Sequence, residues 1–422
     1  MNMRIYPCAP SGTIKAIASK SVAHRLLICA AFADKPTLIR CEETNKDIEA
    51  TANCLSALGA KITRVDGAYS VTPVSPDSVN KNAILPCGES GSTLRFLIPV
   101  VAALGADASF LMEGRLPSRP LSPLKEELEA HGISFSAAGS NPLKVTGKLI
   151  GNEYSIAGNV SSQFISGLLF ALSLMNEKAT LTVKEPIESA PYIKITLDSL
   201  THFSAPADVC GNIYTTNGKS FVSPSSIDVE GDWSNAAFPL ALGILGGGSI
   251  SITGLCEHSS QGDKAIVELL RRFGGNISCI DGVYTASHSE LHAIDIDASQ
   301  IPDLVPILAT VASVAEGQTR IYGAARLRLK ESDRLESTSA FLSSLGADVR
   351  QTDDGLVING KPSLTGGIAN AYNDHRIAMS AAVAACVCSS AVTVIGAEAT
   401  SKSYPAFWQH LASLGISCEQ CE

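Results

Sequence analysis

The chain has 422 residues, of which 45% are hydrophobic, 17% charged and 5% aromatic. This composition is typical of a globular protein and excludes a disordered or collagen-like chain. Its 32 Lys and Arg against 41 Asp and Glu give a net charge of −9, so the whole-protein field offers nucleic acid no general attraction. We expect two folded domains and no nucleic-acid partner.

The amino-terminal segment MNMRIYPCAP has no apolar run after Arg4, which predicts neither a signal peptide nor a transit peptide and favours a cytoplasmic protein. The twelve cysteines are scattered and lie mostly among apolar residues, as expected of reduced core residues in a chain of this size. No metal site is predicted. The uncharged stretch at 378–397 is rich in Ala, Ser and Thr, and we interpret it as a buried helix and strand rather than a membrane span.

A motif recurs along the chain with a spacing of about 70 residues, the signature of a repeat architecture. It consists of a Leu-spaced helical pattern, one small residue and a short strand, as in LSALGAKI and LSSLGADV. A left-handed residue, usually glycine, commonly ends a helix at such a place. The six positions are Gly59, Gly132, Ser204, Gly274, Gly346 and Gly415.

A second marker has the same period, a Ser or Asp just before an apolar helical run that we expect to be buried. The six predicted N-caps are Ser21, Ser92, Ser162, Asp232, Asp303 and Asp374. Because the first three are serines and the last three aspartates, we expect two lobes of three repeats. The Pro- and Ser-rich segment 222–232 is interpreted as a hinge or crossing between them.

Buried helix starts favour anions, because their backbone N–H groups are unpaired and the helix dipole is positive there. Residues suited to anions stand at these starts: Lys20 and Arg25 at the first, a Gly- and hydroxyl-rich loop at 88–95, and His375 with Arg376 at the sixth. The chain lacks both a P-loop lysine motif and a strand-GxGxxG-helix unit. The pattern therefore predicts a site for anions without specific support for a nucleotide.

Ten short motifs occur in an order and at intervals that resemble the 5-enolpyruvylshikimate-3-phosphate synthase family: SKSVAHR, GESGSTLRF, RLPSRPL, SSQF, ESAPY, EGDWS, IPD, LKESDR, YNDHR and TSKSYP. The resemblance covers essentially the whole chain. It implies an α/β fold of two lobes, each of three βαβαββ repeats with buried helices in an inside-out, barrel-like arrangement, and an active site in the inter-lobe cleft. We expect one lobe at 1–14 plus 229–422, on the phosphoenolpyruvate side, and the other at 15–228, on the shikimate-3-phosphate side.

The reaction that the resemblance implies is transfer of the enolpyruvyl group of phosphoenolpyruvate to the 5-hydroxyl of shikimate 3-phosphate, through a tetrahedral intermediate and with release of phosphate. This is a step of chorismate and aromatic amino acid biosynthesis and needs no cofactor. Both substrates are phosphorylated carboxylates, and such groups require helix N-termini with Lys and bidentate Arg. We expect a monomer without a membrane partner, and a target of glyphosate.

The resemblance also implies residue roles. Asp303 would take the 5-hydroxyl proton, and Glu331 would manage the C3 methylene proton with Lys20 as its partner. The implied shikimate-3-phosphate contacts are Lys20, Ser21, Arg25, Ser161, Ser162, Gln163, Ser189, Tyr192, Asp303 and Lys330. The implied phosphoenolpyruvate contacts are Lys20, Gly91, Arg119, Gln163, Arg334, His375, Arg376 and Lys402. Glu89 departs from the family pattern and is left out.

Three alternatives remain open. The enolpyruvyl transferase that acts on UDP-N-acetylglucosamine shares the fold, but its pattern has Lys-Asn in place of Lys20–Ser21 and a Cys in the loop that reads RLPSRPL here. A non-catalytic repeat scaffold gives no reason for Asp303 and Glu331 to accompany several basic residues. An RNA-end-processing enzyme on a related repeat is disfavoured by the negative net charge.

Overall fold

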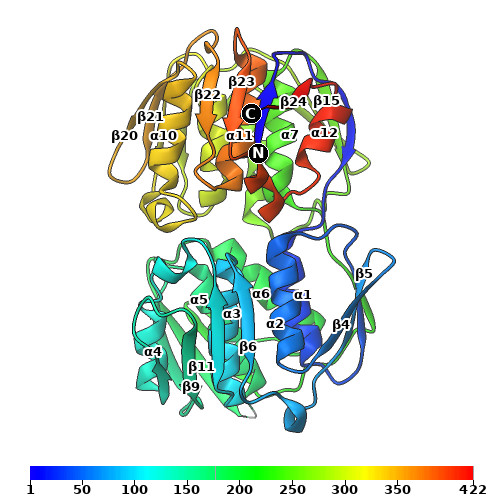
Figure 1. Ribbon diagram of the computed structural model, residues 1–422, viewed down its shortest axis with the longest axis vertical. Coiled ribbons are helices and arrows are strands. Elements are labelled where there is room, and N and C mark those ends of the chain that lie inside the picture. The colour runs from blue at the N-terminus through cyan, green and yellow to red at the C-terminus, as the bar shows by residue number, and fades with distance from the viewer. Residues whose placement is uncertain (176, 422) are drawn as a thin grey trace. The chain divides into compact units, whose positions relative to one another are not determined.

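The computed structural model describes residues 1–175 and 177–421, and the chain divides into two compact units (Figure 1). Unit 1 comprises Met1–Ile17 and Glu230–Glu422, and unit 2 comprises Ala18–Val229. The strands of the described residues form six four-stranded sheets, three in each unit.

One repeat of unit 2 shows the common plan. Strand β10 (Glu153–Ala157) leads into the buried helix α5 (Ser162–Leu174) and strand β11 (Lys178–Lys184). Helix α6 (Ala190–His202) then precedes the hairpin of β12 (Asp208–Cys210) and β13 (Ile213–Asn217). The sheet order is β10-β11-β13-β12, and the parallel pair β10–β11 needs a crossover connection, which α5 provides. This is the predicted βαβαββ repeat.

The other two sheets of unit 2 have the orders β14-β3-β5-β4 and β6-β7-β9-β8. Their strands are β3 (Thr37–Arg40), β4 (Lys61–Val65), β5 (Ala68–Thr72), β6 (Ile84–Gly88), β7 (Ala108–Met112), β8 (Ile133–Phe135), β9 (Leu143–Gly147) and β14 (Ser226–Asp228). The helices are α1 (Lys20–Ala31), α2 (Lys46–Ala57), α3 (Gly91–Leu104) and α4 (Leu124–Ala130), with 3-10 turns η1 (Pro76–Ser78) and η2 (Leu116–Ser118).

The sheets of unit 1 have the orders β22-β23-β1-β24, β16-β17-β15-β2 and β18-β19-β21-β20. Their strands are β1 (Asn2–Ile5), β2 (Gly12–Lys15), β15 (Ser249–Thr253), β16 (Asn276–Ile280), β17 (Val283–Ser287), β18 (Asp295–Asp297), β19 (Gln318–Tyr322), β20 (Asp348–Gln351), β21 (Leu356–Asn359), β22 (Gly367–Asn370), β23 (Val392–Ile395) and β24 (Cys418–Cys421).

The helices of unit 1 are α7 (Trp233–Leu245), α8 (Ile266–Arg272), α9 (Val305–Ala312), α10 (Arg334–Ser344), α11 (His375–Ala384) and α12 (Phe407–Ser413). Its 3-10 turns are η3 (Gly262–Ala265), η4 (Pro302–Leu304), η5 (Ala325–Leu329), η6 (Ala385–Val387) and η7 (Ala397–Lys402). Helices α7, α9 and α11 contact one another inside this unit, and their residues are buried around the whole circumference, as expected of helices that are apolar on nearly every face.

Three sheets are completed by strands from distant parts of the sequence. Strand β1 pairs with both β23 and β24, and β2 runs parallel to β15. Strand β14 lies within the segment 222–232 and runs parallel to β3. The segment that we interpreted as a hinge or crossing therefore also contributes an edge strand to unit 2.

The predicted N-caps are correct at two of the six places. Asp232 and Asp374 cap α7 and α11, where their side chains accept hydrogen bonds from the backbone N–H groups of Asn235 and Arg376. Helices α1, α3 and α5 begin earlier than predicted, so that Ser21, Ser92 and Ser162 lie inside their first turns and the N-caps are Ser19, Ser90 and Ser161.

Asp303 is not an N-cap. It lies in the 3-10 turn η4, and the residue before α9 is Leu304. Because Pro306 lacks a backbone N–H group, a capping side chain at residue 303 has one donor fewer to satisfy. The carboxylate of Asp303 is therefore available for other partners.

The left-handed positions match prediction, and the uncharged stretch near the carboxyl end does so for its helix but only partly for its strand. All six repeat positions have positive φ, from 58° at Ser204 to 119° at Gly59. Residues 378–397 contain most of the buried helix α11, followed by η6 and the strand β23, in which Val392 and Val394 are buried while Ile395 is 39% exposed. Within the described part of the chain, no helix is long and apolar enough to cross a membrane.

Candidate active site

Arg25 joins three helices in unit 2. Its side chain is 2% exposed, and its Nε donates to Oγ1 of Thr196 at 2.8 Å, while Nη1 donates to the Ser21 carbonyl at 2.7 Å. Nη2 donates to the Tyr192 carbonyl at 2.9 Å and to Oγ of Ser166 at 3.3 Å. Burial lowers the pKa of the Arg25 guanidinium to about 9, which leaves it charged at neutral pH. Arg25 therefore places a positive charge near the start of α1 and fixes the backbone carbonyl of Tyr192.

Lys20 is the first residue of α1, and its side chain is largely buried. Its Nζ lies 2.9 Å from Oδ2 of Asp47 in the first turn of α2. An ion pair with both partners 17% exposed holds the ammonium in one place better than an open surface pair would. Sequence reasoning did not single out Asp47.

Gln163 connects the starts of α3 and α5. Its Oε1 accepts from Nη1 of Arg95 at 2.8 Å, and its Nε2 donates to Oγ of Ser92 at 2.8 Å. Ser161 caps α5 by accepting from the backbone N–H of Gln163. Ser161, Ser162 and Gln163, which we predicted as substrate contacts, thus lie together at one helix start.

Gly91 and Arg119 are in close contact. A Cβ atom at residue 91 would lie 2.7 Å from Nη1 of Arg119, which is closer than any real side chain tolerates. The guanidinium of Arg119 therefore lies over the first residue of α3, where backbone N–H groups favour an anion. Both residues were predicted to bind phosphoenolpyruvate.

Ser189 occupies a strained position before α6. It is buried and has φ +55°, a left-handed conformation that costs energy for a residue other than glycine. Its carbonyl accepts from the backbone N–H of Tyr192. Strain of this kind persists where the surrounding structure fixes it.

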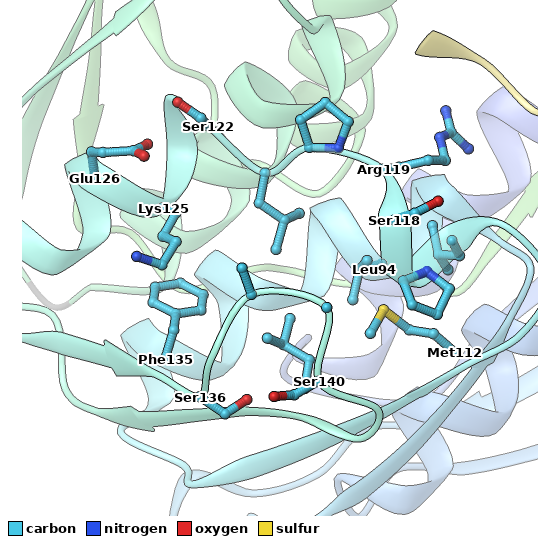
Figure 2. A pocket seen from close by; sticks show the side chains of 17 residues that line it. Leu94, Met112, Ser118, Arg119, Ser122, Lys125, Glu126, Phe135, Ser136 and Ser140 are labelled. Carbon is cyan, nitrogen blue, oxygen red and sulfur yellow. The ribbon is translucent and has the colours of Figure 1, made fainter. Parts of the chain in front are cut away.

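An apolar pocket of about 530 Å³ lies beside the Arg119 loop in unit 2 (Figure 2). Its walls include Leu94, Met112, Leu116, Phe135 and Leu143, with Arg119 at its edge. In Figure 2 the guanidinium of Arg119 is directed away from these apolar side chains. None of the other predicted substrate contacts lines this pocket, so it is a neighbour of the Arg119 loop rather than the anion site.

Asp303 is the centre of the cluster in unit 1. Its Oδ1 accepts from Nη1 of Arg334 at 2.7 Å, and Lys330 Nζ lies 3.5 Å from the same oxygen. Its Oδ2 accepts from Nη2 of Arg376 at 3.0 Å. Three cations, from the residue after η5 and from α10 and α11, thus surround one carboxylate that is 17% exposed.

Arg334 is fully engaged by carboxylates. Its Nε lies 2.8 Å from Oδ2 of Asp374, and its Nη2 lies 2.7 Å from Oε2 of Glu331. Burial opposes the charge of the Arg334 guanidinium, but the carboxylates of Asp374, Glu331 and Asp303 outweigh it and raise its pKa. Arg334 therefore holds Asp303 and Glu331 on one planar group.

Lys330, His375 and Lys402 surround this cluster. Burial lowers the pKa of the Lys330 ammonium to about 8, although Asp303 acts in the opposite direction. His375 follows the cap of α11, with Nδ1 3.9 Å from Oδ1 of Asp374. Lys402 is 9% exposed and donates to the Asn373 carbonyl at 2.8 Å. Because Asn373 has a positive φ, the turn before the cap is what aims this carbonyl.

The structure brings several predicted residues of unit 2 into separate local contacts, and it gathers those of unit 1 around Asp303. Asp303, Lys330, Glu331, Arg334 and Arg376 form one hydrogen-bonded cluster in unit 1. Sequence reasoning identified Asp374 as a cap but missed that it binds Arg334. The YNDHR motif places this carboxylate directly before His375 and Arg376 but gives no sign of Arg334, which lies 40 residues away in sequence.

The fold and this geometry can be compared with known proteins. A family model described as EPSP synthase (3-phosphoshikimate 1-carboxyvinyltransferase) matches residues 7–411. The chain belongs to this family. Two 3-phosphoshikimate 1-carboxyvinyltransferases, from Clostridium kluyveri and Clostridium acetobutylicum, are each 40% identical to it. The alignments cover 97% and 98% of this chain, and 96% and 97% of the relatives.

Solved structures of the EPSP synthase family agree with this assignment. The EPSP synthase of Acinetobacter baumannii superposes with a TM-score of 0.81 at 26% identity, covering 99% of this chain and all of that one. The resemblance proposed from ten sequence motifs is therefore confirmed, and so is the fold class.

Proposed function

We propose that the residues described above in the two units carry out the reaction of this family, in which the enolpyruvyl group of phosphoenolpyruvate passes to the 5-hydroxyl of shikimate 3-phosphate and phosphate is released. The function follows from membership of the family. The observation that supports the residue assignment is the carboxylate of Asp303 held by Arg334 and Arg376, with Glu331 on the same arginine.

The substrates are assigned to the units as follows. Unit 2 supplies shikimate-3-phosphate contacts from Lys20, Ser21, Arg25, Ser161, Ser162, Gln163, Ser189 and Tyr192, and phosphoenolpyruvate contacts from Lys20, Gly91, Arg119 and Gln163. Unit 1 supplies Asp303 and Lys330 for shikimate 3-phosphate and Arg334, His375, Arg376 and Lys402 for phosphoenolpyruvate. Helix starts and arginines in both sets match the phosphate and carboxylate groups of the two substrates.

In the addition step, the oxygen of the 5-hydroxyl forms a bond to C2 of phosphoenolpyruvate as its proton passes to Asp303. The C2–C3 double bond opens, and C3 takes a proton from Glu331, which gives a tetrahedral intermediate. Arg334 contacts both carboxyl groups, so it fixes the proton acceptor and the proton donor relative to each other.

In the elimination step, the bond between C2 and the phosphate oxygen breaks, and the phosphate leaves with the electron pair and takes up the proton that Asp303 accepted in the addition step. Glu331 recovers the C3 proton as the C2–C3 double bond re-forms in the product. Lys20 is proposed as the cation that assists this proton transfer, and its ion pair with Asp47 restrains its position. Arg119 and Lys402 balance the charge of the departing phosphate.

The experiment compares Glu331→Gln and Asp303→Ala with Glu336→Gln, which changes an exposed carboxylate in the first turn of α10. Turnover is measured by phosphate release, and shikimate-3-phosphate affinity by calorimetry. We expect the first two variants to lose about 100-fold or more in kcat, with a much smaller loss of affinity, and Glu336→Gln to match the wild type. Near-normal turnover of Glu331→Gln or Asp303→Ala would remove its catalytic assignment.

We also propose that the enzyme acts as a monomer in the cytoplasm. All twelve cysteines are free thiols, which suits a reducing compartment. Light scattering with size-exclusion chromatography tests the monomer, for which a mass of 44.0 kDa is expected.

A further inference from the structure

Asp263 lies in η3, a turn that is fixed against the start of α7. Gln261, which precedes this turn, accepts from the backbone N–H of Trp233 at 3.1 Å and donates to the Gly231 carbonyl at 2.8 Å. Asp263 itself is 2% exposed. The protein thus buries a carboxylate at a fixed place beside the second residue of α7, Ser234.

A chain of hydrogen bonds leads from Asp263 to the reaction centre. Oγ of Ser234 donates to Oδ2 of Asp263. The same Oγ accepts from Nη2 of Arg376 at 2.7 Å, and this Nη2 also donates to Oδ2 of Asp303 at 3.0 Å. Both hydrogens of Nη2 are therefore used, one on Ser234 and one on Asp303.

Asp263 determines which group donates in the two hydrogen bonds of Ser234. A serine hydroxyl has one hydrogen, and the carboxylate of Asp263 takes it, so the lone pairs of Ser234 are left for the guanidinium of Arg376. Without that acceptor the hydroxyl can rotate, and Arg376 loses one of the two groups that fix Nη2.

We propose that Asp263 is a positioning residue for the enolpyruvyl transfer: acting through Ser234, it orients the guanidinium of Arg376 toward Asp303 and toward the phosphoenolpyruvate that Arg376 binds. This inference rests on the proposed roles of Arg376 and Asp303. Asp263 contacts neither substrate in this proposal, and its effect passes through the hydroxyl of Ser234.

The charge of Asp263 is costly to keep, which supports a role other than stability. Burial and the nearby carboxylate of Asp303 raise the pKa of Asp263 to about 6, against the opposing effect of Arg376. Asp232 adds a further negative charge, and α7 has no titratable side chain. Because the raised pKa disfavours the ionised form in the folded protein, that form lowers the free energy of unfolding at neutral pH.

The basic side chains of η3 and α8 donate to backbone carbonyls rather than to Asp263. Lys264 of the same turn donates to the Glu257 carbonyl. On α8, which follows η3, Arg271 and Arg272 donate to the carbonyls of Ile277 and Asp295, and Glu268 adds a carboxylate. Arg376 is therefore the cation that opposes the raised pKa of Asp263.

The test compares kcat/KM for phosphoenolpyruvate in the wild type and Asp263→Asn at pH 8.0 and pH 5.5. At pH 8.0 we expect Asp263→Asn to be about tenfold slower, equivalent to ~1.4 kcal/mol, with shikimate-3-phosphate affinity within about twofold. At pH 5.5 the ratio of the two enzymes should fall to about threefold, because about three quarters of Asp263 is then protonated in the wild type. The ionisation of the substrates affects kcat/KM of both enzymes equally, so its effect cancels in this ratio.

Three further variants separate positioning from structure. Ser234→Ala should reproduce the loss, adding Asp263→Asn to it should cost nothing more, and Ser234→Thr, which keeps the hydroxyl, should retain most activity. Ser251→Ala, which removes a hydroxyl pair between β15 and β17, is the matched control and should leave kcat/KM unchanged. The melting temperature of Asp263→Asn at pH 8.0 should equal or exceed that of the wild type.

The proposal fails if Asp263→Asn has wild-type kcat/KM at pH 8.0, if its deficit is the same at both pH values, or if the effects of Asp263→Asn and Ser234→Ala add. A lower melting temperature with unchanged kinetics would assign Asp263 a structural role instead. Absence of turnover in the wild type would overturn the proposed function rather than this inference.

Discussion

Arg334 and Asp374 form a two-point pair in which both side chains are buried. The Nε of Arg334 lies 2.8 Å from one carboxylate oxygen of Asp374, and its Nη2 lies 3.3 Å from the other. Asp374 also accepts from the backbone N–H of Arg376 at 3.0 Å and thereby caps α11. One carboxylate therefore orients both arginines that hold Asp303.

Replacing Asp374 by Asn removes the most buried of the three carboxylates that contact Arg334. Because breaking a buried ion pair is strongly destabilising, we expect a loss of about 3 kcal/mol in the free energy of unfolding, together with a strong loss of turnover. Asp333→Asn, at the cap of α10, is the control and should cost at most about 1 kcal/mol with little change in turnover. Chemical denaturation and phosphate release measure both effects, and equal behaviour of the two variants would contradict the role of Asp374.

Adding a methyl group at Gly91 should displace Arg119. The new Cβ would meet Nη1 at 2.7 Å, so the guanidinium must move from the helix start. We expect Gly91→Ala to raise KM for phosphoenolpyruvate by about tenfold, or ~1.4 kcal/mol, while KM for shikimate 3-phosphate changes little. Lys125→Ala, in helix α4 near the same loop, serves as control. An unchanged KM for phosphoenolpyruvate in Gly91→Ala would argue against this contact.

The strained backbone of Ser189 allows its hydroxyl to be tested separately from its conformation. Glycine accepts φ +55° without cost, whereas alanine does not. We expect Ser189→Gly to be more stable than Ser189→Ala by about 1 kcal/mol, and both variants to bind shikimate 3-phosphate more weakly to a similar degree. If both bind it as the wild type does, the Ser189 hydroxyl is not a substrate contact.

The lowered pKa of Lys330 predicts a pH dependence. The ammonium is charged below about pH 8 and loses its proton as the pH rises through that value. Since the charge attracts the phosphate of the substrate, kcat/KM for shikimate 3-phosphate should fall above pH 8. Lys330→Arg should move this fall to higher pH, because a guanidinium stays protonated, and Lys361→Arg, an exposed lysine of the same unit, should not. A profile that is flat from pH 7 to 10 would contradict the assignment.

Local features of the sequence predicted the repeat, its left-handed residues and the caps Asp232 and Asp374, because each depends on neighbours within one turn. The starts of α1, α3 and α5 were misplaced, since several serines compete for the cap at each place. Side-chain contacts between residues distant in sequence could not be predicted from local features. Arg334 and Asp374 are 40 residues apart, and Arg376 and Ser234 are 142 residues apart. Asp263 gave no signal, because nothing near it in sequence indicates its partner.

The most direct measurement is phosphate release from phosphoenolpyruvate with shikimate 3-phosphate or UDP-N-acetylglucosamine as acceptor, without added metal or nucleotide. We predict that phosphate is released when shikimate 3-phosphate is the acceptor and not when UDP-N-acetylglucosamine is. One phosphate should be released for each enolpyruvyl ether formed, and Asp303→Ala should lose this release. Release with UDP-N-acetylglucosamine and none with shikimate 3-phosphate would contradict the function, and full release by Asp303→Ala would contradict the site.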